Sequence, residues 1–283
     1  MSEDLTPSVG AIDIYRGRRA VLATRHGKEQ AVAPAFLDAL GLDVIVPEGL
    51  DTDSLGTFTG EVARTGSMRE TALRKARMGM SAAGLPLAIA SEGSFGPHPV
   101  IPFLPAGHEV LVFIDAERGF EIFEEQLTEQ TNYAALDVTP GVDIEAFLLQ
   151  AGFPQHALVV RTGETVTKGV TSRDDLERLL AGESPVHLAT DMRAHMNPTR
   201  MAAITQLAGR LARRVAAACP SCGAPGFGTL RAVRGLPCED CGAPTQLVDH
   251  VVDGCALCLH ELRRPRPDGR LTATPAECPE CNP

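Results

Sequence analysis

The cysteines constrain this chain more than any other feature. All eight follow residue 218, and every one belongs to a Cys-x-x-Cys pair, here called a knuckle. Two knuckles can direct four thiolates at one tetrahedral ion, so the spacing predicts two four-sulfur zinc sites in a C-terminal zinc-ribbon-like module. The expected ligands are Cys219, Cys222, Cys238, Cys241, Cys255, Cys258, Cys278 and Cys281.

The spacing leaves the pairing of the knuckles open, since sequential, nested and crossed arrangements all close two sites. Of these we favour the sequential arrangement. A disulfide framework requires an oxidising compartment, and no export signal is recognisable in the sequence. Cysteine pairs also hold iron and sulfur, so iron stays an alternative to zinc.

Composition and charge exclude several classes of protein. The 283 residues are 44% hydrophobic and 22% charged, as in ordinary folded domains. A net charge of −10 opposes binding to nucleic acid or anionic membrane, and the absence of Trp argues against a base-stacking platform. No apolar run approaches the roughly 20 residues that cross a bilayer. We therefore expect a cytoplasmic protein without membrane or nucleic-acid partners.

The first 218 residues carry an α/β pattern. Apolar runs predict strands, and helical periodicity with capping signals predicts helices between them. We expect a mixed, twisted sheet with flanking helices, arranged as a lead-in (1–17), an α/β domain (18–213) and a double-zinc module (214–283). The expected strands are 20–24, 43–47, 85–90, 109–115, 120–123, 156–161 and 165–170, and the expected helices end at Leu40, span 67–83 and 141–151, and begin at Ser172 and Pro198.

One loop is singled out by its composition. Ser91 to Pro99 contains two glycines and two prolines after a buried strand, so we expect irregular structure there. Ligands of open α/β sheets bind at such strand ends. The sequence therefore places a candidate site beside this loop.

Four short motifs resemble those of the house-cleaning nucleoside triphosphate pyrophosphatases, the inosine triphosphatase-like enzymes. They are Ala23-Thr-Arg-His-Gly-Lys28, Thr65-Gly-Ser67, Glu70-Thr-Ala-Leu-Arg-Lys-Ala-Arg77 and Gly84-Leu-Pro86, and the resemblance covers roughly residues 18–95. It implies hydrolysis of a nucleoside triphosphate to the monophosphate and pyrophosphate, with Mg²⁺ from solution. The whole chain, zinc module included, also resembles an uncharacterised bacterial family.

The resemblance also implies roles for particular residues. Lys28 and Lys75 would face phosphate oxygens, and Thr24 would cradle them. Glu70 and Glu92 would hold Mg²⁺, with Glu92 orienting the attacking water. Glu70 also has a plain structural interpretation, because Ser67-Met-Arg-Glu70 has capping-box spacing.

Two parts of the family pattern differ here. The usual paired acids after the Gly-Leu-Pro strand are replaced by Ala90-Ser-Glu-Gly93, which holds one acid, Glu92. The Ser-His-Arg base-binding motif is absent, and His195 and Arg200 are the substitutes we expect. His26 and His98 would lie at the rim of the site, in contact with phosphate or base.

Two hypotheses follow. The first is a Mg²⁺-dependent nucleotide pyrophosphohydrolase, or a descendant that still binds nucleotides. The alternative is a non-catalytic zinc-ribbon adaptor for a partner protein or nucleic acid. Residues 219–283 contain six arginines against eight acids, which favours a protein. The first hypothesis requires Glu70, Glu92, Lys28 and Lys75 to meet in one cleft, and the second does not.

Overall fold

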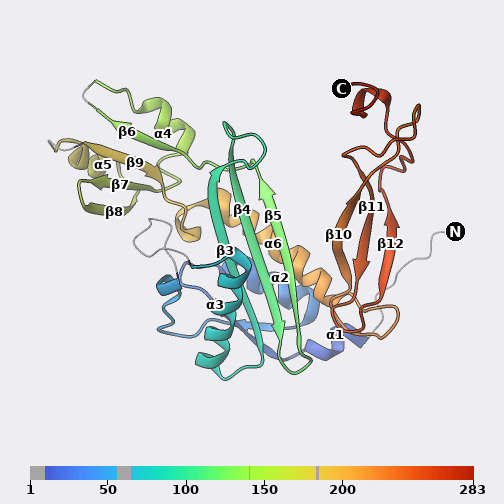
Figure 1. The fold of residues 1–283 in the computed structure, drawn as a ribbon. Coiled ribbons are helices and arrows are strands. Elements are labelled where there is room, and N and C mark those ends of the chain that lie inside the picture. The colour runs from blue at the N-terminus through green and yellow to red at the C-terminus, as the bar shows by residue number, and fades with distance from the viewer. Residues whose placement is uncertain (1–9, 56–64, 140, 183–184) are drawn as a thin grey trace. The chain divides into compact units, whose positions relative to one another are not determined.

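A computed structural model describes residues 10–55, 65–139, 141–182 and 185–283 (Figure 1). The described chain forms two compact units, which we treat separately: residues 17–212, and residues 213–283 together with 10–16. In these described ranges, no helix combines the length and the apolar character needed to cross a membrane.

The first unit contains a five-stranded mixed sheet in the order β2-β1-β3-β4-β5. Its strands β1 and β3 run parallel, whereas β3, β4 and β5 form an antiparallel meander. The strands are β1 (Arg19–Ala23), β2 (Asp43–Ile45), β3 (Leu87–Pro97), β4 (Pro105–Asp115) and β5 (Phe120–Thr128).

Helices cover both faces of this sheet. Helix α3 (Met68–Ala83) packs on β1, β3 and β4 through a core of mostly small residues, including Ala72, Ala76 and Ala90. Helix α2 (Glu29–Leu40) packs on the other face, where its Phe36 ring stacks on Phe113. A short helix, η1 (Thr52–Leu55), precedes α3.

A second, four-stranded sheet follows in the same unit, in the antiparallel order β6-β9-β7-β8. One of its faces forms an apolar core with two helices that include Phe147 and Leu176. The elements are β6 (Ala135–Val138), α4 (Glu145–Ala151), β7 (Leu158–Thr162), β8 (Thr165–Val170), α5 (Arg173–Leu180), β9 (Val186–Thr190), η2 (Ala194–Met196) and α6 (Pro198–Ala216).

The expected mixed α/β fold with a cysteine-rich C-terminal module is confirmed, but the expectation for the loop after Ala90 is wrong. β3 continues without a break to Pro97, because each residue from Leu87 to Pro97 pairs with β4. Long-range pairing thus overrides the local preference of glycine and proline. Strands β6 and β9 were not expected from the sequence. The seven expected strands belong to two sheets, five to the first and two to the second.

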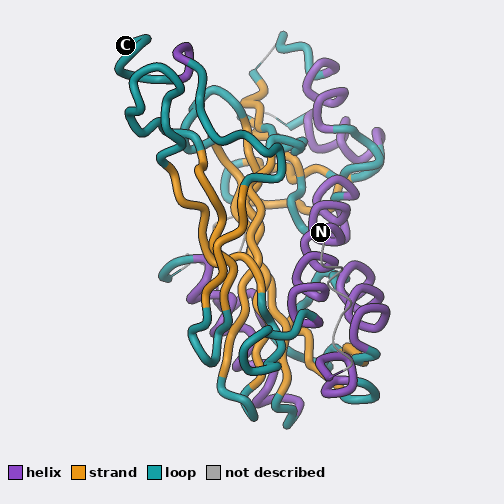
Figure 2. Tube along the Cα trace, turned by 90° about the vertical axis from the view of Figure 1, so that its right-hand side faces the viewer, coloured by secondary structure: helices purple, strands orange, loops and turns teal. Residues whose placement is uncertain are grey.

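The second unit is built on a three-stranded antiparallel sheet of β10 (Gly228–Arg234), β11 (Val248–Gly254) and β12 (Glu261–Pro265). The end of the chain, with the short helix η3 (Pro275–Glu277), lies at one end of this sheet (Figures 1 and 2). Residues 10–15 of the expected lead-in form helix α1 (Gly10–Tyr15), and residues 1–9 lie outside the described part.

Candidate functional site

The first unit encloses a cavity of about 280 Å³ whose walls come from both of its sheets. Cationic side chains dominate the described wall, although the whole chain carries a net charge of −10. Six lysines or arginines and two acids contribute: Arg25, Lys28, Lys75, Arg161, Lys168 and Arg193, against Glu92 and Asp191. Lys75 and Arg193 pair with the two acids, and the described wall still holds more cations than acids.

Lys28 lies at the start of α2, after a tight turn in which Gly27 has a φ of +68°. Its Nζ donates a hydrogen bond to Oγ of Ser91 at 2.8 Å, and the side chain is buried. Burial, reinforced by the charge of Arg200, lowers the pKa of Lys28 to about 7. The amine is therefore poised between its charged and neutral forms near neutral pH.

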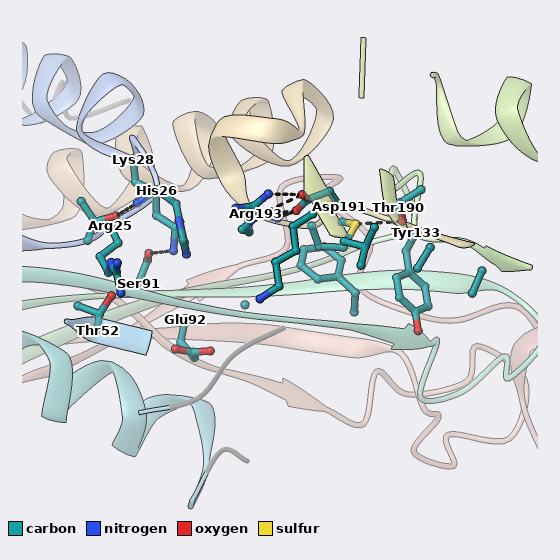
Figure 3. A pocket seen from close by; sticks show the side chains of 18 of the residues that line it. Arg25, His26, Lys28, Thr52, Ser91, Glu92, Tyr133, Thr190, Asp191 and Arg193 are labelled. Carbon is teal, nitrogen blue, oxygen red and sulfur yellow. Dashed lines mark hydrogen bonds and ion pairs between the residues drawn. The ribbon is translucent and has the colours of Figure 1, made fainter. Parts of the chain in front are cut away.

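Lys75 and Glu92 form a buried ion pair across the cleft wall. Lys75 comes from α3 and Glu92 from β3, and Nζ lies 2.6 Å from Oε2. Ser91 and Glu92 are neighbours on β3, so one strand segment contacts both lysines, Lys28 and Lys75. Figure 3 shows Lys28, Ser91 and Glu92 together in one part of the cleft.

Glu70 does not line the cleft. Its Oε2 accepts the backbone N–H of Ser67 at 2.7 Å, which completes a capping box at the start of α3. These hydrogen bonds from Ser67 lower the pKa of the Glu70 carboxyl. In the described residues, the groups of three or more Cys, His, Asp or Glu side chains close enough to share a metal are the two cysteine groups. Glu70 and Glu92 therefore do not come together as the expected pair of Mg²⁺ ligands.

The remaining expected residues fall into two groups. Thr24 and His26 line the cleft. His195 is not a lining residue, but its ring stacks on that of His26, with ring centroids 5.2 Å apart. His98 and Arg200 are not among the lining residues. The ring Nδ1 of His98 instead accepts the backbone N–H groups of the turn that follows it.

Arg200 is a buried support for the cleft. Its Nε donates to Oε1 of Glu109 at 2.6 Å, and it also donates to the backbone carbonyl of Met192. The guanidinium carbon lies 5.1 Å from the ring centroid of Phe95, which does line the cleft. Arg200 therefore positions neighbouring side chains, and the expected direct contact with a base is not seen.

Sequence reasoning missed the cleft residues that come from the second sheet, among them Arg161, Lys168 and His187. A signal for one of them was present. The chain has only three lysines, at 28, 75 and 168, and all three line this one cavity.

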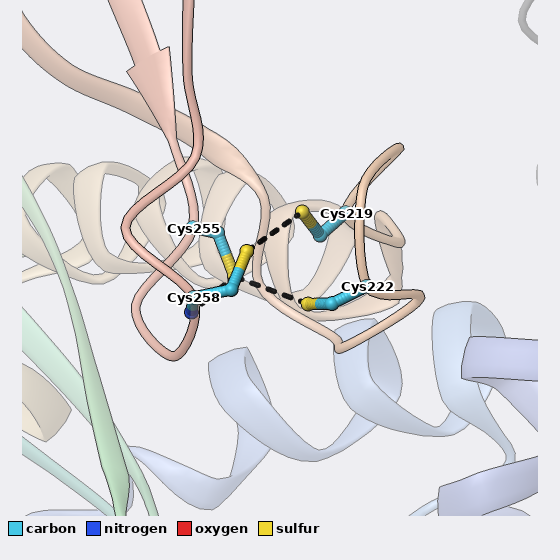
Figure 4. A group of neighbouring side chains, drawn as sticks. All are labelled: Cys219, Cys222, Cys255 and Cys258. Carbon is cyan, nitrogen blue, oxygen red and sulfur yellow. Dashed lines mark hydrogen bonds between the residues drawn. The ribbon is translucent and has the colours of Figure 1, made fainter.

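The eight cysteines form two groups of four, in which the sulfur atoms lie within 4.8 Å of one another. The closest Sγ–Sγ distances between knuckles are 3.7 and 3.8 Å. Four sulfurs about 2.3 Å from a central zinc stand about 3.8 Å apart in a tetrahedron. Both groups therefore fit a single tetrahedral ion, and these distances are far too long for disulfides. Figure 4 shows the first group.

The pairing is crossed, so our preference for the sequential arrangement is wrong. Cys219 and Cys222 join Cys255 and Cys258, and the second and fourth knuckles form the other group. A single strand separates each knuckle from the next: β10, β11 and β12 in turn. Because these strands are antiparallel, the chain changes ends of the sheet with every strand, and alternate knuckles meet.

Comparison with known families covers most of the chain. The model of a family described as a domain of unknown function, DUF6671, matches residues 75–283. The chain belongs to this family. The DUF6671 region contains Lys75, Glu92, the second sheet and all eight cysteines, whereas Lys28 precedes it. No curated protein matches the chain.

Proposed function

We propose that the cleft binds a nucleoside triphosphate through its phosphates. The observation that carries the proposal is that all three lysines of the chain line this one cavity. The other 23 of the 26 lysine and arginine residues in the chain are arginines. Lysine supplies a compact point charge on a flexible stem, which suits phosphate oxygens.

The lysines at 28 and 75 are unusual for their residue type, because lysine is almost always solvated. Here both are buried, and each contacts a polar side chain of the same β3 segment. A bound phosphate would accept hydrogen bonds from both amines and favour the charged form of Lys28. Thr24, which also lines the cleft, adds a hydroxyl donor beside them. The adaptor hypothesis gives no reason for this convergence.

Binding of ATP and GTP to Lys75→Met, measured by calorimetry at constant salt, tests the proposal. We expect affinity at least about tenfold below wild type, equal to about 1.4 kcal/mol. Arg178→Met is the matched control, because this side chain is 76% exposed on α5 and does not line the cleft. Equal affinities for wild type and Lys75→Met, or no binding to wild type, would overturn the proposal.

Pyrophosphohydrolysis is a second candidate. Three of the four residues that it was expected to require, Lys28, Lys75 and Glu92, meet in one cleft, whereas the fourth, Glu70, caps α3 instead. In this candidate Glu92 orients the attacking water once the triphosphate engages Lys75. The test is pyrophosphate release from a panel of triphosphates with Mg²⁺ in solution. Loss of release in Glu92→Gln with triphosphate binding retained would support it, and no release from wild type would exclude it.

We also propose that each four-cysteine group holds one structural Zn²⁺. The support is the tetrahedral spacing of the sulfurs and the thinness of the module's core, since most residues of β10 and β12 are exposed. Zinc coordination supplies on the order of 10 kcal/mol in small modules of this kind. Such an ion would hold the ends of the three-stranded sheet.

A further inference from the structure

We infer that the nucleotide bound in this cleft carries phosphate at both ends, a 3′-phosphate as well as its 5′-phosphates; a nucleoside 3′,5′-bisphosphate is the simplest probe of this class. The inference rests on the proposed nucleotide binding and specifies the class of nucleotide. Lys28 and Lys75 account for one cationic region. The third lysine, Lys168, belongs to a second region that comes from the other sheet and also contains Arg161.

The register of the second sheet places this second region on one face. Arg161 on β7 lies directly opposite His187 on β9, and Lys168 on β8 lies opposite Val159 on β7. Residues opposite each other in a sheet point to the same face. Alternate residues, such as Val160 and Leu188, belong to the buried core on the other face. The cavity wall here is therefore one sheet face, with Arg161, Lys168 and His187 on it.

Small apolar side chains occupy the middle of this face. Ala135, Ala189 and Val159 lie in one row across β6, β9 and β7, and all three line the cavity. This uncharged row suits the ring-containing middle of a nucleotide, which carries no charge. The cations at Arg161 and Lys168 border this surface.

A buried carboxylate holds the second region in place. Asp191 accepts the backbone N–H of Gly169, the neighbour of Lys168, at 3.1 Å. The same carboxylate pairs with Arg193, whose Nη2 lies 2.6 Å from Oδ2. Asp191 is therefore already matched by a cation, and it fixes the strand that carries Lys168. Figure 3 shows Asp191 and Arg193 apart from Lys28 and Ser91, in another part of the cleft.

Basic residues on a strand usually form a solvated surface, so the positions of Arg161 and Lys168 decide how they are interpreted. Among the described wall residues contributed by the second sheet and the segment after it, cations outnumber the single acid, Asp191. Val159 in the middle of the face is only 9% exposed, so this face is partly enclosed. Lys168 is half-buried and Arg161 is exposed at the border of this face. A cationic region beside a partly enclosed surface favours a second anionic group.

The test compares two ligands with equal numbers of phosphates: a nucleoside 3′,5′-bisphosphate, with phosphate at both ends, and the 5′-diphosphate, with both at one end. Both are measured with adenosine and guanosine against wild type and the double variant Arg161→Gln/Lys168→Gln. We expect the double variant to bind the bisphosphate at least about tenfold more weakly and the 5′-diphosphate less than about threefold more weakly. Unchanged melting temperature establishes that the variant is folded.

Arg173→Gln/Arg178→Gln is the control, because it removes the same charge from α5 of the same region, outside the cleft. An equal loss of affinity for both ligands would overturn the inference, because the two cations would then act only through their long-range electrostatic attraction. A change only in preference between keto and amino bases would also overturn it, because the cations would then contact the base. If neither ligand binds wild type, the proposed nucleotide binding itself fails.

Discussion

At the residue scale, Lys28 is a buried amine whose charged form destabilises the fold. Its pKa falls from 10.5 in a solvated side chain to about 7, first because of burial and then because of the positive charge of Arg200. Lys75 acts in the same direction, whereas Glu109 and Glu92 partly oppose it. Between pH 7 and 10.5 the unfolded chain binds the proton more tightly than the folded chain. Folding stability therefore rises with pH across this window.

The predicted rise of folding stability with pH can be tested with Lys28→Met. At or below pH 7 the folded protein must hold a buried charge, so removing the amine raises stability, by about 1 kcal/mol after loss of the hydrogen bond to Ser91. The gain corresponds to about 2–4 °C in melting temperature. It shrinks as the pH approaches 10.5, where both states lose the proton. Calorimetric scans at pH 6, 7.5 and 9 measure it, and a larger gain at pH 9 than at pH 6 would contradict the argument.

At the element scale, β3 carries Ser91 and Glu92, which contact the two lysines, and it also packs against the buried ion pair of Arg200 and Glu109. Gly93 follows Glu92 on this strand, and a Cβ there would lie 2.5 Å from Nη2 of Arg200 and 2.7 Å from Oε1 of Glu109. Glycine at 93 therefore makes room for the Arg200–Glu109 ion pair. Gly93, which in the sequence indicates a loop, is required in the folded sheet because no larger residue fits there.

Gly93→Ala should destabilise the first unit by about 2–4 kcal/mol, because the methyl group must displace a buried ion pair. Gly96→Ala is the control on the same strand, where a Cβ would meet nothing within 4 Å. We expect the control to stay within about 1 kcal/mol of wild type. Urea unfolding of both variants provides the comparison, and equal destabilisation would show that strand propensity, not the ion pair, decides.

At the scale of the whole molecule, the chain combines a cleft lined by cations with a module that carries two four-cysteine groups. The antiparallel order of β10, β11 and β12 brings alternate knuckles together at opposite ends of the sheet. Each ion would then link segments far apart in sequence, such as Cys219 and Cys258. The long loops closed in this way make zinc a large contributor to the stability of the module.

Double variants distinguish crossed from sequential pairing. Cys219→Ser/Cys255→Ser removes two ligands of one group, so we expect one zinc per chain instead of two. Cys219→Ser/Cys238→Ser takes one ligand from each group, and we expect less than one zinc per chain. Metal content by atomic emission after dialysis against a weak chelator measures both. Retention of one zinc by the second variant would restore sequential pairing.

Some features were predictable because their signals are local. The Cys-x-x-Cys spacing predicted the cysteines that gather in groups able to hold a metal. Ser67 and Glu70 predicted the start of α3, and Gly41 predicted the end of α2, where it adopts a φ of +62°. Each depends on residues only a few positions apart. The same holds for Ser172, whose side chain caps α5.

Other features were decided by contacts between distant segments. Cysteine spacing is the same for crossed and sequential pairing, so only the strand order of the module distinguishes them. Likewise, Lys28, Lys75 and Lys168 are 47 and 93 residues apart along the chain, and no local pattern places them in one cavity. The sequence by itself determined which residues can ligate metal and where α3, α5 and α6 begin. The tertiary structure alone decided which of them meet, because strand pairing and packing act between residues that are remote in sequence.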